Sequence, residues 1–90
     1  MQAQGIEPAL AQPYRRAAGM EFGRFMVRAR QREGLTQAQF AEKLSMDQVD
    51  ISRLESGGRC PRLDTFVRVI VTLEADPREV VEAIADAYRL

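Results

Sequence analysis

The stretch Leu35–Pro61 reads LTQAQFAEKLSMDQVDISRLESGGRCP and carries the start and stop signals of two short helices. Thr36 stands three residues before Gln39, which is the capping-box pattern that opens a helix. Asp47 is a favourable N-cap for a following helix, and the glycine pair at 57–58 ends that helix. The stretch therefore predicts two consecutive helices whose apolar residues turn toward a shared core.

Helical periodicity continues on both sides of this stretch, and the apolar pattern never alternates as it does in strands. One helix runs upstream to Gly34, and two more begin downstream, just after Pro61 and at the start signal Asp76-Pro77. The apolar positions that trace the five helices are Phe22, Phe25, Met26, Ala29, Phe40, Ala41, Leu44, Ile51, Leu54, Leu63, Phe66, Val67, Ile70, Leu73, Val80, Val81, Ile84, Ala87 and Tyr88. Five such helices predict an all-α fold.

Residues 1–19 differ in composition from the rest of the chain. Two glycines and two prolines stand there among Ala and Gln, and no helical stripe is sustained through that spacing of breakers. We therefore expect a flexible N-terminal arm over residues 1–19, with a helical start near Tyr14. The ordered domain is expected over residues 20–90.

The composition argues against several classes of protein. A chain of 90 residues forms one domain, and 46% hydrophobic with 29% charged residues is an ordinary globular balance. No apolar run approaches the roughly 20 residues that cross a bilayer, and no signal-peptide pattern is present. The single cysteine, Cys60, favours a reducing cytoplasm. Because the chain has no histidine, the commonest general base and metal ligand, we expect no enzyme activity, no metal and no cofactor.

The net charge of zero hides an asymmetry along the chain. Between Arg15 and Arg62, ten basic residues stand against six acidic ones, whereas residues 63–90 carry three basic and six acidic residues. A locally basic region points to an anionic partner such as nucleic acid. The alternative interpretation is a solvated surface on which basic residues happen to cluster.

Taken whole, Leu35–Pro61 resembles the Cro/repressor-type helix-turn-helix family, also called the xenobiotic-response-element type. The matching features are Leu-Thr-Gln at the start of the second helix, Phe40-Ala41 inside it, a turn of about three residues, the run ISRLE at 51–55, and Gly57 followed by Pro61. The resemblance covers roughly residues 21–76. It implies a five-helix lambda-repressor-like DNA-binding domain over residues 20–90, preceded by the arm, with the last helix used for dimerisation.

The resemblance also implies roles for individual residues. The third helix would enter a major groove, where glutamine pairs with adenine, arginine with guanine, and an apolar side chain packs on the thymine methyl. The residues implied at base edges are Gln48, Val49, Ser52 and Arg53. Those implied at the DNA backbone or in the minor groove are Gln37, Arg59, Arg62, Arg15 and Arg16. In the family a first-helix arginine pairs with a glutamate near the end of the third helix, which here implies an ion pair between Arg30 and Glu55.

On the fifth helix one apolar stripe, Val80, Ile84 and Ala87, is expected to close the core, and a second stripe lies beside it. Val81, Ala85 and Tyr88 recur at i, i+4 and i+7, and Leu90 extends them. A stripe of this kind on the surface predicts an interaction site, and a two-fold homodimer covers it most simply. Two third helices about 34 Å apart would then read an inverted repeat. A fifth helix that folds back and buries both stripes is the alternative.

These features predict a sequence-specific transcriptional regulator that binds double-stranded DNA, with repression as its output. Two departures from the family pattern leave a second hypothesis open. Asp50 stands where the family usually has Ser or Thr, and Phe25 and Val27 are apolar where polar residues are usual; extra core is one interpretation of the latter two. The alternative function is a protein-binding regulator with this fold, an antiactivator or antitoxin, whose surface contains Phe25, Val27 and Asp50.

Overall fold

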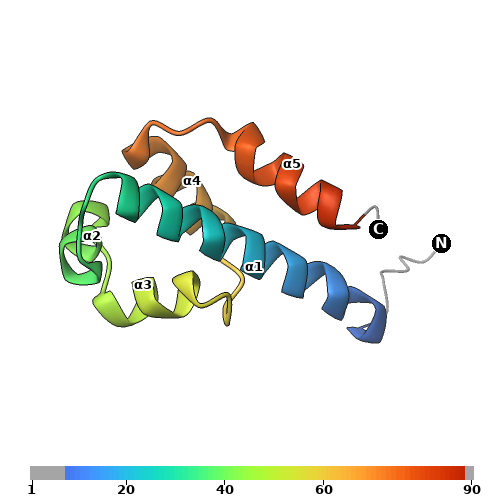
Figure 1. The fold of residues 1–90 in the computed structure, drawn as a ribbon. Helices are drawn as coiled ribbons and strands as arrows, with labels where there is room; N and C mark the ends of the chain where they lie inside the picture. The colour runs from blue at the N-terminus through green and yellow to red at the C-terminus, as the bar shows by residue number, and fades with distance from the viewer. Residues whose placement is uncertain (1–7, 89–90) are drawn as a thin grey trace.

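The computed structural model describes residues 8–88, which form five helices joined by short loops (Figure 1). The helices are α1 (Pro8–Arg32), α2 (Gln37–Leu44), α3 (Gln48–Glu55), α4 (Leu63–Leu73) and α5 (Pro77–Tyr88). No strand occurs within residues 8–88, and the predicted all-α fold is confirmed. The long helix α1 runs through the middle of the molecule and packs against both α5 and α3, which lie on either side of it in Figure 1.

Local sequence signals set both ends of α2. Thr36 Oγ1 accepts a hydrogen bond from the Gln39 backbone N–H at 3.1 Å, and Gln39 Oε1 accepts one from the Thr36 N–H at 2.9 Å. The predicted capping box is therefore confirmed. Ser45 ends α2 in the left-handed conformation with φ 55°, and the Met46 N–H donates to the Ala41 carbonyl at 2.9 Å. The chain reverses there and enters α3 after a three-residue turn.

Residues 8–19 are helical, which corrects the expectation of a flexible arm over residues 1–19. Pro8 is the first residue of α1, where its missing N–H costs no hydrogen bond, and the alanines between it and Gly19 favour a helix. Gly19 itself is buried against the α3–α4 loop, where a Cβ would lie 3.2 Å from the Gly57 carbonyl oxygen. Gly19 is therefore a packing residue and not a helix breaker. Residues 1–7 lie outside the part that the structure describes.

The buried residues form one apolar core between the helices. Its largest fully buried side chains are Phe22, Phe40, Met26, Leu44, Ile51, Leu54, Val69 and Val80. Burying a side chain of this size contributes about 1.5–3 kcal/mol to stability. The ring of Phe22 on α1 lies 5.7 Å from the ring of Phe66 on α4, measured between centroids, so aromatic contact joins these two helices.

The helix α4 enters the core with only part of the stripe that the apolar pattern traces: Ile70 is buried, and Phe66 and Leu73 pack against the core. Leu63 and Val67 belong to the traced pattern, but their side chains are 77% and 49% exposed. Val69, which the pattern omits, is fully buried beside Ile70. Seven of the eleven positions of α4 are apolar, so two overlapping stripes fit the sequence equally well. Only the packing of α4 against its neighbours selects one of them.

The helix α5 begins at the predicted signal and turns the predicted stripe inward. The Arg78 guanidinium donates to Asp76 Oδ2 at 3.0 Å and the Arg78 backbone N–H donates to Asp76 Oδ1 at 2.9 Å. These hydrogen bonds lower the pKa of Asp76 below its usual value, the guanidinium contributing most. Val80 is buried and Ile84 packs against the core, which confirms the inward assignment of both residues.

The close crossing of α1 and α3 occurs at Gly23. A Cβ on Gly23 would lie 2.6 Å from the Leu54 carbonyl oxygen and 2.9 Å from that of Glu55, both closer than real Cβ contacts. The absence of a side chain therefore lets the backbones of the two helices touch. This crossing brings the end of α3 against α1, where Arg30 lies about two turns beyond Gly23.

Candidate nucleic-acid interface

The helix α3 presents an exposed face opposite the residues that it buries. Ile51 and Leu54 are 0% and 1% exposed and fix the orientation of α3 against the core. The four side chains that the sequence predicts at base edges are all exposed: Gln48, Val49, Ser52 and Arg53. Their spacing of i, i+1, i+4 and i+5 gathers them on one side of the helix. That side offers an amide, an apolar group, a hydroxyl and a guanidinium to a partner.

A buried carboxylate at the end of α3 ties this helix to α1. Arg30 Nε donates to Glu55 Oε2 at 2.7 Å and Arg30 Nη2 donates to Glu55 Oε1 at 3.0 Å, which is a two-pronged pair. The Glu55 side chain is only 4% exposed. Arg30 Nη1 also donates to the Leu35 carbonyl at 3.0 Å, in the loop before α2. The hydrogen bond to Glu55 raises the pKa of Arg30, because it stabilises the charged guanidinium.

Gln37, the first residue of α2, joins the same carboxylate. Its Nε2 donates to Glu55 Oε1 at 2.9 Å, so Glu55 connects α1, α2 and α3. The sequence predicts a phosphate contact for Gln37. The hydrogen bond from Gln37 to Glu55 joins residues 18 apart in the chain, so no local sequence signal predicts it. The second amide hydrogen of Nε2 and the backbone N–H at the start of α2 are the donors that such a phosphate contact would use. The hydrogen bond to Glu55 fixes where those donors lie.

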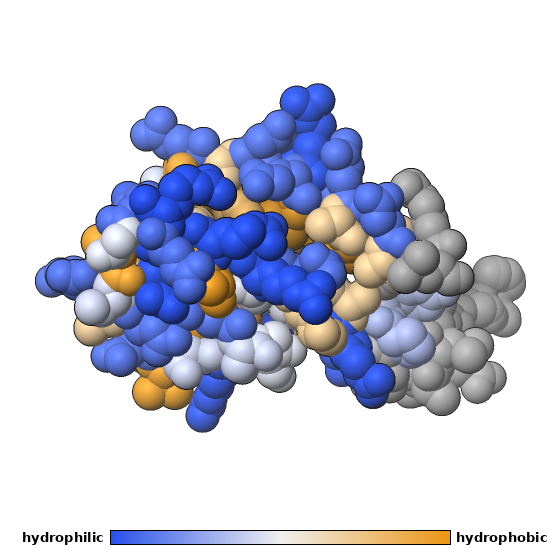
Figure 2. Space-filling model, in the orientation of Figure 1, coloured by the Kyte–Doolittle hydropathy of each residue, from blue (hydrophilic) through white to orange (hydrophobic). Residues whose placement is uncertain are grey.

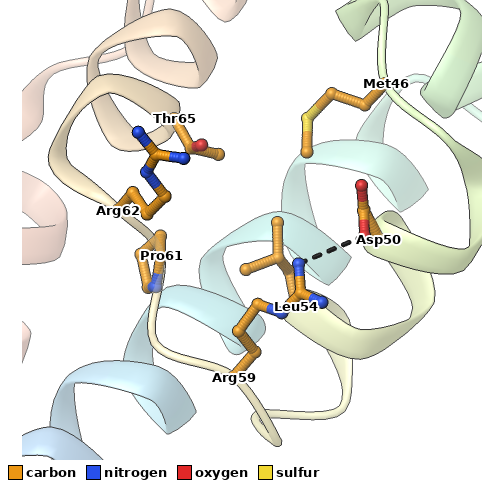
Figure 3. A pocket seen from close by; sticks show the side chains of 7 residues that line it. All are labelled: Met46, Asp50, Leu54, Arg59, Pro61, Arg62 and Thr65. Atoms are coloured by element: carbon orange, nitrogen blue, oxygen red, sulfur yellow. Dashed lines mark hydrogen bonds and ion pairs between the residues drawn. The ribbon is translucent and has the colours of Figure 1, made fainter.

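The loop after α3 places a second ion pair beside the exposed face. Arg59 Nη1 lies 3.1 Å from Asp50 Oδ1, and both side chains are about two-fifths exposed, at 43% and 37%. Figure 3 shows the pair at one side of a hollow of about 270 Å³, with Arg62 and Thr65 on the other side and Leu54 in its floor. Asp50 and Arg59 are nine residues apart and separated by a loop, so no sequence pattern predicts the ion pair. It neutralises an arginine that the sequence predicts at the DNA backbone.

The remaining predicted backbone contacts lie further from the start of α3. Arg62 is the N-cap residue of α4, and its side chain is 84% exposed with Asp64 Oδ1 3.5 Å from its Nε. Arg15 and Arg16 are exposed on the N-terminal part of α1, so they lie on a helix and not on a flexible arm. Figure 2 shows that hydrophilic residues cover most of the viewed face over α2 and α3, with hydrophobic ones in separate patches. A polar surface of this kind suits a charged partner.

A comparison with family models matches residues 21–90 to a helix-turn-helix domain. The matched region begins where Phe22 enters the core and includes the capped turn between α2 and α3. The chain belongs to the helix-turn-helix domain family. Domains of this family are typically non-enzymatic DNA-binding modules. No curated protein and no solved structure matches the chain.

The alternative function requires a surface formed by Phe25, Val27 and Asp50. This helix-turn-helix domain does not expose these three residues in the way that the sequence suggests. Phe25 is 4% exposed, and its ring centroid lies 6.0 Å from that of Phe22, so it belongs to the core. The expectation of Phe25 as a contact for a partner protein is therefore wrong, and the interpretation as extra core is confirmed for this residue. Val27 is half-buried, and Asp50 is engaged by Arg59.

The second apolar stripe of α5 is only partly described. Val81 is 52% exposed, whereas Ala85 is half-buried. The side chain of Tyr88, and the whole of Leu90, lie outside the described residues, so their part in a dimer interface stays a prediction. Among the described residues, no helix of this helix-turn-helix domain is long and apolar enough to cross a membrane, and no cluster of three metal-ligating side chains occurs.

Replacing Asp50 by serine is expected to strengthen binding to random duplex DNA by up to about tenfold at 0.1 M salt. The change removes a carboxylate and frees Arg59 for one more phosphate contact. The slope of the logarithm of the binding constant against the logarithm of the salt concentration then steepens by about one. Asp47→Ser is the matched control, because Asp47 makes no side-chain cap hydrogen bond and the charge change is the same. Fluorescence anisotropy of a labelled duplex, titrated at several salt concentrations, measures both quantities.

Equal effects of Asp50→Ser and Asp47→Ser would contradict the role assigned to Arg59, because charge alone would then explain both. If Asp50 instead accepts a hydrogen bond from a cytosine amino group, Asp50→Ser relaxes the preference at one base pair and leaves random DNA binding unchanged.

Proposed function

We propose that this protein is a sequence-specific DNA-binding transcriptional regulator that acts as a repressor and reads an inverted repeat as a homodimer. The observation that carries the proposal is the exposed face of α3, where Gln48, Val49, Ser52 and Arg53 lie together beside the capped start of α2. Membership of the helix-turn-helix domain family supports it. Repression is the simplest output, because a protein that occupies an operator excludes other proteins from the same DNA.

The four side chains of this face suit the chemistry of base edges. Arg53 pairs with the O6 and N7 atoms of guanine, and Gln48 pairs with the N6 and N7 atoms of adenine. Val49, 59% exposed, packs on a thymine methyl. Ser52 accepts or donates at either kind of base. The face therefore reads several adjacent base pairs without any rearrangement of α3.

The backbone contacts come from the elements on either side of α3. The start of α2 offers backbone N–H groups and the Gln37 amide to a phosphate. Arg59 and Arg62 follow α3 and reach the neighbouring phosphates, and Arg59 first has to leave Asp50. An exposed ion pair of this kind is worth about 0–1 kcal/mol, so phosphate competes for the guanidinium easily. Arg15 and Arg16 extend the basic surface along α1.

The test begins with random duplex DNA at low salt. A groove binder shows nonspecific affinity that falls steeply as salt rises, with a slope set by the number of phosphates neutralised. On the preferred site, selected from a random library, Arg53→Ala and Gln48→Ala are each expected to lose about 1–3 kcal/mol and to relax the preference at one base pair. Arg78→Ala is the control, since Arg78 lies at the start of α5 and pairs with Asp76.

Unchanged binding of both variants to the selected site would show that α3 does not read bases. No binding of the wild-type protein to any duplex at low salt would exclude the DNA-binding function altogether. That second result would favour the protein-binding alternative, for which Val49 and the acidic start of α3 are then the available surface.

A further inference from the structure

The helix α4 exposes an apolar stripe that the fold leaves uncovered. Leu63, Val67 and Val71 are 77%, 49% and 68% exposed, and they recur at i, i+4 and i+8 on one side of the helix. We call these three residues the α4 stripe. Of the two buried residues that α4 places in the core, Val69 lies on the far side of the helix from Val67, and Ile70 lies beside the stripe near Leu63. Large apolar side chains that gather on a surface in this way mark an interaction site.

The apolar surface continues beyond α4. Leu63 lines a hollow of about 220 Å³ whose other walls include Ala18 and Phe22 on α1 and Ile84 on α5. Leu63 and Val67 also line a wider, shallower depression of about 650 Å³, together with Arg62 and Asp64. Leu63 belongs to both, so one apolar face runs from α5 and α1 onto the α4 stripe. A partner seated on the stripe therefore also covers the hollow beside it.

The charges along one edge of the α4 stripe indicate what the partner is. Asp64 and Arg68 lie on the same edge, four residues apart, and both are exposed. When two copies of α4 pack antiparallel about a two-fold axis at Val67, Leu63 of one copy faces the partner's Val71. In that arrangement the same edges of the two helices meet, so Asp64 lies beside the partner's Arg68, and the reverse pair forms as well. The surface is self-complementary in both its apolar and its charged residues.

We propose that the α4 stripe is the surface through which two copies of this chain associate, with their α4 helices antiparallel. The proposal rests on the homodimer of the proposed function and gives it an interface. The stripe exposes three large apolar side chains, whereas Val81 is the one large apolar residue described as exposed on α5. Arg68 is available for the contact, because its present hydrogen bond to the Ser45 carbonyl is long, at 3.4 Å.

The first experiment is sedimentation of the full chain between about 1 and 100 μM, the range of many modest self-associations. Val67→Glu is expected to weaken dimerisation at least about a hundredfold, since it places a pair of like charges at the two-fold axis. Val81→Glu is the matched control on α5 and is expected to leave the dimer intact. Both residues are exposed, and circular dichroism checks that each variant keeps its helices. A monomeric wild-type protein, or an effect of Val81→Glu alone, overturns the proposal.

The second experiment tests the charged edge by reversal and rescue. Asp64→Arg and Arg68→Asp are each expected to weaken the dimer about tenfold or more, because each change creates two like-charge contacts. The double variant Asp64→Arg/Arg68→Asp restores opposite charges and is expected to return dimerisation to within about threefold of wild type. A partner of a different sequence would not give this rescue, and a double variant no better than either single variant overturns the antiparallel arrangement.

Binding to random duplex DNA separates this inference from the function on which it rests. No residue of the α4 stripe is assigned to a DNA contact, so monomeric Val67→Glu is expected to keep nonspecific DNA binding. It is expected to lose the gain in affinity that an inverted repeat gives over a single half-site. A Val67→Glu protein that stays dimeric overturns the α4 interface even when it binds DNA normally. A wild-type dimer that fails to bind DNA refutes the DNA-binding function and leaves the interface standing.

Discussion

Replacing Arg30 by alanine is expected to lower the free energy of unfolding by about 3–5 kcal/mol. The substitution leaves the Glu55 carboxylate, 4% exposed, with the Gln37 amide as its only side-chain hydrogen-bond donor among the described residues. A buried charge without its counter-ion carries the full cost of its removal from water. Because a domain of this size has only about 5–15 kcal/mol of stability in total, the loss is a large fraction of it. Urea unfolding followed by circular dichroism measures the change.

Arg24→Ala is the matched control for this prediction. Arg24 also lies on α1 and pairs with Glu21 at 2.8 Å, but its side chain is 59% exposed, so the loss is expected to stay within about 0–1 kcal/mol. Arg30→Lys keeps the charge and loses the two-pronged geometry, and an intermediate loss is expected. Equal losses for Arg30→Ala and Arg24→Ala would show that the buried pair contributes no more than a surface one.

Replacing Gly23 by valine is expected to destabilise the fold by about 3 kcal/mol or more, at the upper end of the range for overpacked sites. A Cβ there would lie 2.6 Å from the Leu54 carbonyl oxygen, which belongs to a helix backbone and cannot turn aside as a side chain does. The gain of up to about 1 kcal/mol from removing a glycine inside a helix is too small to compensate. The shift needed to make room also separates Arg30 from Glu55. Thermal unfolding measures the loss.

Gly58→Ala provides the contrast for Gly23→Val. A Cβ at Gly58 would meet Ser56 Oγ at 3.3 Å, and a serine side chain can rotate away. The expected change is therefore within about 0.5 kcal/mol, as for other surface substitutions. A Gly23→Ala variant as stable as wild type would mean that α1 and α3 separate at little cost. The close crossing would then not be a constraint on the fold.

The parts of the fold that the sequence predicts correctly depend on contacts between near neighbours in the chain. The capping box of Thr36 and Gln39 and the start of α5 at Asp76 involve residues two or three apart. The sequence pattern gives the wrong prediction where contacts between residues far apart in the chain determine which side chains are buried. The sequence pattern predicts Gly19 to be a helix breaker, although Gly19 packs on the loop near Gly57. The side chain of Leu63 is exposed because of how α4 packs on its neighbours, and the sequence of α4 alone does not predict that packing.

The candidate site divides in the same way. The exposed face of α3 follows from helical spacing once Ile51 and Leu54 are assigned to the core, and the pairing of Arg30 with Glu55 is implied by resemblance to a family rather than by the physics of the sequence. The hydrogen bond from Gln37 to Glu55 spans 18 residues, and the Asp50–Arg59 pair crosses a loop. Neither interaction corresponds to a periodic or local pattern in the sequence, so both could be found only from the three-dimensional structure.

The shared carboxylate of Glu55 also decides which segments open together. When the start of α2 frays alone, Glu55 loses the hydrogen bond from Gln37, and when the end of α3 frays alone, both Arg30 and Gln37 lose their bonds to Glu55. A buried polar group with an unmade hydrogen bond is costly. We therefore expect the backbone amides of α2 and α3 to exchange with solvent as one cooperative unit. The start of α1, exposed over residues 13–16, is expected to open by itself at low free energy. The turn between the two short helices is thus already ordered before any partner arrives, and little conformational entropy is lost at the encounter.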